Sequence, residues 1–121
     1  MVAPKGQQLW IGERVVIFEL RQYRMRPGQR DEWVQFMEAE IIPFQTSKGM
    51  QIMGSWVGEE DTDLFVWIRR FESEAERVRL YAEVYESDHW KNAIAPRIPT
   101  LIDREQIKVT RMLPTPASAM R

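Results

Sequence analysis

The chain has 121 residues, of which 44% are hydrophobic and 29% are charged, and its formal net charge is −1; these values are typical of one soluble globular domain. It lacks the strong basic patch that nucleic acids and anionic membranes require, and it has no apolar run of the ~20 residues that a membrane-spanning helix needs. The absence of Cys excludes disulfides, a thiolate nucleophile and Cys-ligated metals, and it fits a cytoplasmic protein.

Residues 1–14 contain two glycines and one proline and show no periodicity, so we expect them to form an N-terminal extension. A single folded domain is predicted over 15–113, followed by a short C-terminal tail at 114–121, which begins with Pro114.

The first strand is predicted at 15–25, where alternate positions place Glu19, Arg21 and Tyr23 on one face. A charge in the middle of a strand must find a partner, a ligand or water, because burying it alone is costly. This strand is therefore a first indication of a working surface.

A helix is predicted from Arg30, because the apolar residues that follow recur at close to the 3.6-residue period. Pro43 cannot donate a backbone hydrogen bond, so we expect it to kink or end the regular helix near Glu40.

Two strands are predicted next, at 50–58 and 63–71, and the polar turn between them is so short that they should form an antiparallel hairpin. On the second of these strands, Phe65, Trp67 and Arg69 share one face. A second central charge thus accompanies a large aromatic side chain.

Ser73 begins the next predicted helix, since Glu76 three residues later makes a capping box. The apolar residues expected on or beside its buried face are Ala75, Val78, Leu80, Tyr81, Ala82, Val84 and Tyr85.

A short helix is predicted to start at Ser87 and to be broken by Pro96 and Pro99. The last strand is predicted at 106–113.

The predicted order β-α-β-β-α-β is that of the ferredoxin-like fold, an α+β architecture in which a four-stranded antiparallel sheet carries two helices on one face. In this plan the first and third strands are central, which places both charged strands in the middle of the sheet. The other sheet face should be apolar and uncovered, and such a face favours a homodimer with two sheets packed together.

Several segments of the chain resemble the NIPSNAP family: FELRQYRMRPG at 18–28, GSW at 54–56, FVWIRRF at 65–71 and SDHWK at 87–91. The resemblance covers about residues 16–121 and implies a dimeric α+β barrel. Relatives of that fold include cofactor-free monooxygenases, haem-degrading enzymes and small-molecule isomerases.

The resemblance therefore implies a protein that acts on or binds a small organic molecule, such as an aromatic or polyketide-like compound. It would act as a cofactor-independent oxygenase or isomerase. The alternative is a non-catalytic module that binds a metabolite or serves as a protein scaffold.

Glu19, Arg21 and Arg69 are expected to form a polar cluster on the central strands. In a functional interpretation, an Arg of this cluster orients a carboxylate or a polarised carbonyl by bidentate hydrogen bonds. In a structural interpretation, the three residues form an ion-pair network inside the dimer barrel.

Tyr23, Trp56 and Trp67 could line an aromatic pocket for a planar ligand, or they could simply fill the core. Trp90, in the last of the segments that resemble the family, is a further candidate for ligand binding.

His89 is the only histidine and the most versatile acid–base group near neutral pH, although it could equally be exposed at a helix start. Tyr81 and Tyr85 are four residues apart, so they share one helix face and either donate to a ligand or pack in the core. We expect His89, Arg69 and Tyr23 to be catalytic if the protein is an enzyme. No bound metal or cofactor is expected, and phosphate-binding and hydrolase motifs are absent.

Overall fold

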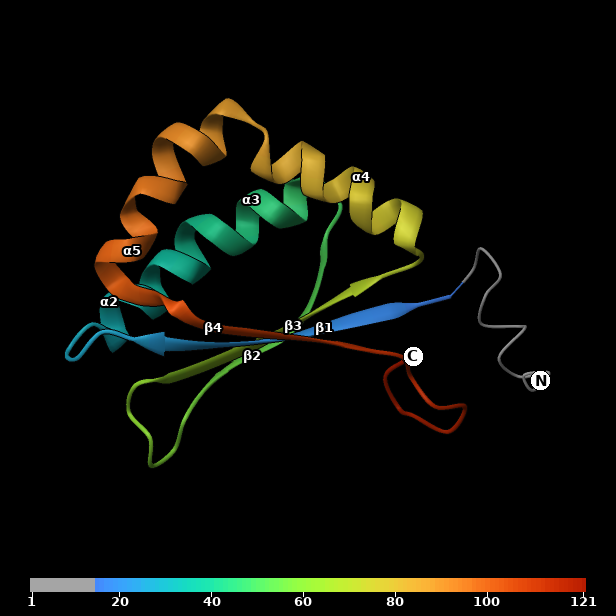
Figure 1. Cartoon of the computed structure of the whole chain (residues 1–121), viewed down its shortest axis with the longest axis horizontal. Coiled ribbons are helices and arrows are strands. Elements are labelled where there is room, and N and C mark those ends of the chain that lie inside the picture. The colour runs from blue at the N-terminus through green and yellow to red at the C-terminus, as the bar shows by residue number, and fades with distance from the viewer. Residues whose placement is uncertain (1–14) are drawn as a thin grey trace.

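The computed structural model describes residues 15–121, so the predicted extension at 1–14 lies outside the described residues. The strands are β1 (Ile17–Met25), β2 (Gln51–Val57), β3 (Leu64–Phe71) and β4 (Ile102–Met112). They form one antiparallel sheet in the order β2-β3-β1-β4, and the helices all lie on one side of it (Figure 1). The predicted α+β fold is confirmed, with the first and third strands at the centre.

The two central strands turn their odd-numbered side chains towards the helices. Along β3, odd-numbered residues are buried and even-numbered residues are only half-buried. The register places Glu19 of β1 opposite Arg69 of β3. The two charges that the sequence placed in mid-strand are therefore neighbours on the helix-covered face.

Strand β4 begins earlier than predicted and is irregular. Gln22 of β1 pairs with Lys108 and Arg24 pairs with Asp103, so an advance of two residues along β1 corresponds to five residues along β4. Extra residues of this kind bulge out of the ladder and redirect side chains. Arg104 and Ile107 thereby become part of the wall of a cavity.

The first helical segment runs without interruption through α2 (Arg30–Phe36), a π-helical turn η1 (Met37–Ile41) and α3 (Ile42–Ser47). The prediction is that Pro43 kinks or ends the regular helix near Glu40: the helix does not end there, but its regular α-helical geometry is interrupted by the π turn Met37–Ile41. Pro43 lies in the first turn of α3, where its missing N–H is tolerated, and the wider π turn before it makes room for the proline ring.

The second helical segment starts with α4 (Glu74–Tyr85), capped as predicted: the Ser73 side chain accepts from the Glu76 N–H at 3.1 Å, while the Glu76 carboxylate accepts from the Glu72 N–H at 2.8 Å. Leu80 and Val84 are its fully buried residues. The predicted burial of Ala75, Val78 and Ala82 is wrong, since all three are exposed, Val78 with 56% of its surface.

The chain then continues through η2 (Trp90–Ile94), η3 (Ala95–Arg97) and α5 (Ile98–Leu101). The prediction that Pro96 and Pro99 break the helix is only partly right. Each proline occupies the first turn of a new short helical piece, a position that needs no proline N–H. The prolines divide the segment and bend it around the sheet (Figure 1).

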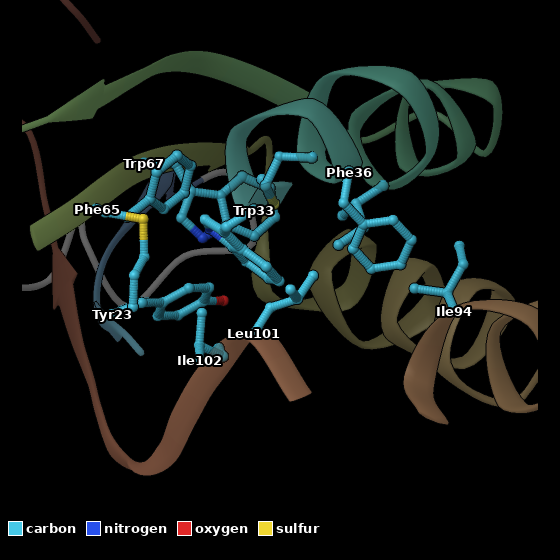
Figure 2. Packing of buried hydrophobic residues seen from close by; sticks show 11 residues of the cluster. Tyr23, Trp33, Phe36, Phe65, Trp67, Ile94, Leu101 and Ile102 are labelled. Atoms are coloured by element: carbon cyan, nitrogen blue, oxygen red, sulfur yellow. The ribbon is translucent and has the colours of Figure 1, made fainter. Parts of the chain in front are cut away.

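The main core lies between the sheet and the two helical segments. Figure 2 shows its aromatic centre, where Tyr23, Trp33, Phe65 and Trp67 pack together at ring-centroid distances of about 6 Å. Edge-to-face packing of this kind stabilises a core beyond the area that it buries. Among residues 15–121, no helix is long and apolar enough to span a bilayer.

The tail after Met112 folds back on the helix-free side of the sheet (Figure 1). Arg70 Nε donates to the backbone oxygen of Arg121 at 3.2 Å, and Met120 borders a hollow together with Phe18 and Ile68. The tail therefore covers one end of a sheet face that the helices leave open.

Candidate functional site

A cavity of about 210 Å³ lies between the sheet and the helical layer. Tyr23 of β1 and Trp67 of β3 border it from the sheet, and Trp33 borders it from α2 (Figure 2). Segments η2 to α5 and the irregular part of β4 close the remaining sides. A mostly apolar wall with a few polar groups is typical of small-molecule sites.

Next to the cavity, Glu19 and Arg69 form a buried ion pair, with only 1% and 0% of the side chains exposed. All five N–H groups of Arg69 have acceptors. Nε and Nη2 donate to Glu19 Oε1 at 3.3 and 2.8 Å. The remaining three donate to the side-chain oxygens of Tyr81, Tyr85 and Gln45 at 2.9, 2.7 and 2.8 Å. Arg69 therefore has no donor left for a ligand, and it holds Tyr85 and Gln45 in place at the cavity wall.

Tyr81 completes this cluster by donating its hydroxyl proton to Glu19 Oε2 at 2.6 Å. Burial alone would raise the pKa of Glu19, but the charge of Arg69 and the hydrogen bonds from Tyr81 and Arg69 outweigh it, so the pKa lies below its ordinary value. Burial raises the pKa of Tyr81 despite the charge of Arg69. Glu19 is thus ionised and Tyr81 neutral at physiological pH.

The polar cluster predicted from the mid-strand charges exists, but its position differs from the structural interpretation. Glu19 and Arg69 form an ion-pair network on the helix-covered face of the sheet, not on the open face where a second sheet would pack. Such a pair rigidifies the site, and removing one partner of a buried pair typically costs about 3–5 kcal/mol.

Among the arginines of β1 and β3, Arg21 is the one that lines the cavity. Its Nε donates to the hydroxyl of Tyr23 at 2.9 Å, and its Nη1 lies 3.6 Å from Glu19 Oε1. Burial opposes its charge, yet the oxygen of Tyr23 favours it, and the net effect raises the pKa of Arg21. Arg21 therefore stays positively charged at the wall while it fixes the orientation of Tyr23.

Two indole groups at the cavity are without hydrogen-bond partners. Within residues 15–121, Nε1 of Trp33 and Nε1 of Trp67 are the buried side-chain polar atoms with no acceptor, although only 1% and 2% of these residues is exposed. An unsatisfied buried donor typically costs about 1–3 kcal/mol, so two of them beside one cavity need an explanation.

The predicted site residues divide into three groups. Five of them line the cavity: Arg21, Tyr23, Trp67, Tyr85 and Trp90. Glu19, Arg69 and Tyr81 form the buried cluster beside it. The other two, Trp56 and His89, lie elsewhere.

Trp56 lies on the edge strand β2, where 49% of its surface is exposed, and borders a wide groove of about 630 Å³ between β2 and α2. Ser55, not Trp56, lies opposite Trp67 in the register. The aromatic pocket expected from Tyr23, Trp56 and Trp67 is therefore built with Trp33 in place of Trp56.

His89 is exposed on the helical layer, and its ring packs against that of Phe44 with centroids 4.7 Å apart. It is not among the residues that line the cavity. The structure thus corresponds to the alternative in which the only histidine is exposed at a helix start.

Among the cavity residues whose side chains can form hydrogen bonds, three were missed in the sequence: Trp33, Gln45 and Arg104. Trp33 and Gln45 had a recognisable signal, because the row at four-residue spacing (Trp33, Met37, Ile41, Gln45) ends in a polar residue on an otherwise apolar helix face. Arg104 had none, since it reaches the wall only through the irregularity of β4.

The NIPSNAP family model matches residues 18–119 of this chain. A solved NIPSNAP family protein from Agrobacterium tumefaciens is 26% identical, with a TM-score of 0.78 over 88% of this chain and 99% of that one. A second protein of the family from the same organism, described as having unknown function, is 23% identical, with a TM-score of 0.79 over 91% and 97% of the two chains.

A NIPSNAP-like domain protein from Burkholderia xenovorans is 23% identical, with a TM-score of 0.77 over 87% of this chain and 90% of that chain. No curated protein matches this chain. These comparisons concern the family and the fold, and the descriptions of these relatives name no reaction and no ligand.

Proposed function

The chain belongs to the NIPSNAP family, and from that premise we propose that it binds a small organic molecule in the cavity between sheet and helices and acts on it there. The observation that carries the proposal is the cavity itself, whose apolar wall brings several hydrogen-bond donors together.

The size of the cavity restricts the ligand. Its volume of about 210 Å³ lies below the roughly 300–1,000 Å³ of pockets that take drug-sized ligands. It suits a molecule with a single ring. The aromatic side chains at its wall, among them Tyr23, Trp33 and Trp67, favour a planar one.

Isomerisation of an enolisable carbonyl compound is the reaction that this wall supports best. Fixed donors stabilise the enolate oxygen that forms when a base takes a proton from the neighbouring carbon, and the same base returns that proton to another carbon, so no co-reactant is consumed. Addition of O₂ to the same kind of anion is the related oxygenase reaction.

One observation favours the non-catalytic alternative. Among the described residues, the cavity wall contains no carboxylate and no imidazole, because Glu19 is engaged by Arg69 and Tyr81 and His89 lies outside. A wall that has donors but lacks an obvious general base could hold a metabolite without transforming it.

We further propose that the protein is a cytoplasmic homodimer in which the helix-free sheet faces pack together. Half-buried apolar residues on that face, such as Leu20, Val66 and Ile68, support the proposal, because such residues gain from further burial. The lack of Cys supports a reducing compartment.

The test is a panel of single-ring ligands, including enolisable carbonyl compounds, measured by thermal shift and calorimetry on the wild type and on Ala95→Phe. Ala95 lines the cavity, so a phenyl group there should fill it and abolish binding. Ala82→Phe, at an exposed position on α4, is the matched control. Turnover of any bound ligand, followed by NMR, separates the enzyme from the binding module. Binding that survives Ala95→Phe would contradict the proposed site.

A further inference from the structure

The polar groups of the cavity wall have an unusual common property: they offer protons. An indole nitrogen can donate a hydrogen bond but cannot accept one. Trp33 and Trp67 each present such a donor without a partner, in a nearly solvent-free position. Both nitrogens are closed to a water-sized atom, so what the two indoles contribute to the wall is the lack of an acceptor.

Each of the two tyrosines at the wall accepts a hydrogen bond from a neighbouring arginine. The hydroxyl oxygen of Tyr23 accepts from Arg21 Nε at 2.9 Å, and that of Tyr85 accepts from Arg69 Nη1 at 2.7 Å. A hydroxyl that accepts from a guanidinium keeps its own proton for another partner. Within the part of the chain that the structure describes, neither hydroxyl donates to a protein acceptor.

Acceptors are scarce at the same wall. The side-chain oxygen of Gln45 is occupied by Arg69 Nη1 at 2.8 Å. No carboxylate is among the described residues that line the cavity. A ligand with N–H or O–H groups would therefore bury them against a wall with few side-chain acceptors left, which weakens binding.

The charges next to the cavity leave an excess of positive charge. The one buried carboxylate, Glu19, contacts Arg69 at 2.8 Å and Arg21 at 3.6 Å, so two guanidiniums face one negative charge. Arg77 also approaches Glu19, but it pairs with Glu74 at 2.9 Å. Arg104 adds a further positive group to the wall.

We infer that the ligand of this cavity is an oxyanion, a small carboxylate or enolate with a planar apolar body, whose oxygens accept from the hydroxyls of Tyr23 and Tyr85 beside the positive charge of Arg21. This inference rests on the proposed function and specifies its ligand class. Arg21 and Arg69 are positioning residues in this arrangement, since they orient the two hydroxyls.

The test compares ligands of the same shape that differ in charge: benzoate with benzamide, and phenylacetate with phenylacetamide, by calorimetry at pH 7. Each carboxylate should bind at least roughly tenfold more tightly than its amide, because hydrogen bonds to an ion are about twice as strong as neutral ones.

Tyr85→Phe removes one hydroxyl donor while keeping the aromatic ring, and it should weaken carboxylate binding several-fold with a smaller effect on the amide. Tyr23→Phe removes the other hydroxyl and should act in the same direction, and it serves as the second variant if Tyr85→Phe is unstable. Trp56→Phe, which removes a donor outside the cavity, should leave both affinities unchanged.

The outcomes are distinguishable. If an amide binds as tightly as its carboxylate and Ala95→Phe abolishes both, the cavity is a binding site and the oxyanion inference is overturned. If no ligand binds, or if Ala95→Phe leaves binding intact, the proposed function fails and the inference fails with it.

Discussion

At the residue scale, the centre of this protein is one guanidinium. Arg69 is fully buried, and its five N–H groups connect the middle of the sheet to two helical segments through Glu19, Gln45, Tyr81 and Tyr85. It also lies over the indole of Trp67, 5.1 Å from the ring centroid. One side chain thereby fixes several of the groups that border the cavity.

Arg69→Met should destabilise the protein strongly, by about 3–5 kcal/mol, because it leaves Glu19 buried without its main counter-charge. Urea unfolding followed by circular dichroism measures the change. The control is Arg79→Met, which removes an arginine whose side chain is 58% exposed and whose ion pairs are at the surface; it should cost less than about 1 kcal/mol. Equal effects for the two variants would contradict the central role of Arg69.

The lowered pKa of Glu19 predicts a pH dependence of stability. Because the pKa is lower in the folded state than the ordinary value of 4.5, the stabilisation is fully present above pH 4.5 and is lost as the pH falls through the folded pKa. In that window the unfolded chain binds a proton that the folded chain does not, which gives a slope of up to about 1.4 kcal/mol per pH unit.

Unfolding free energies measured between pH 5 and pH 3 should therefore fall less steeply in Glu19→Gln than in the wild type. Glu38→Gln, which removes an exposed carboxylate away from the cluster, is the matched control. If the unfolding free energy of Glu19→Gln fell as steeply with pH as that of the wild type, the Glu19 carboxylate would have the same pKa in the folded and the unfolded protein.

At the scale of the elements, local signals determined where helices begin more reliably than where they end. The cap at Ser73 was readable in the sequence and is present, whereas both proline-containing helical segments continue past their prolines. A cap depends on residues within one turn, but a π turn or a short 3₁₀ piece forms only when packing on the sheet favours it.

Ser73→Ala should therefore cost about 1 kcal/mol, because the N–H of Glu76 loses its side-chain acceptor at the start of α4. Thermal and urea unfolding measure the loss. Thr62→Ala, at an exposed position in the turn between β2 and β3, is the control for loss of a hydroxyl and should change little. If the two variants have equal stability, the cap contributes nothing.

Much of the sheet could be predicted, because alternation and element order suffice to place β1 and β3 at its centre. The site was predictable only in part. Both faces of the central strands carry apolar residues, so the sequence did not say which face meets the helices. The register shift between Ile52 and Gly54 puts Ser55 rather than Gly54 opposite Trp67, and a slip of one residue changes the face of every side chain that follows, Trp56 included.

At the scale of the whole molecule, the two faces of the sheet have different roles. One face carries the helices, the buried cluster and the cavity. The other carries half-buried apolar residues and, at one end, the C-terminal tail (Figure 1). This division allows a second copy to pack on the open face without blocking the cavity.

Leu20→Glu should convert the proposed homodimer to a monomer. Leu20 lies on the open face of a central strand, between Ile68 of β3 and Thr110 of β4, so a charge there would be buried by a second sheet. Light scattering after gel filtration should show the wild type at twice the monomer mass and the variant at the monomer mass. Val78→Glu, on the outer surface of α4, should leave the mass unchanged. A wild type that is monomeric at micromolar concentration would contradict the dimer.

The clustering of tryptophans around the cavity also gives the protein a built-in optical reporter. Of the five tryptophans, Trp33, Trp67 and Trp90 border the cavity, and replacing Trp10 and Trp56 by Phe would leave these three as the sole source of indole fluorescence. Emission from shielded indoles is shifted to the blue and resists quenching by iodide in the solvent. In that double variant, the emission would report the filling of the cavity without any added dye.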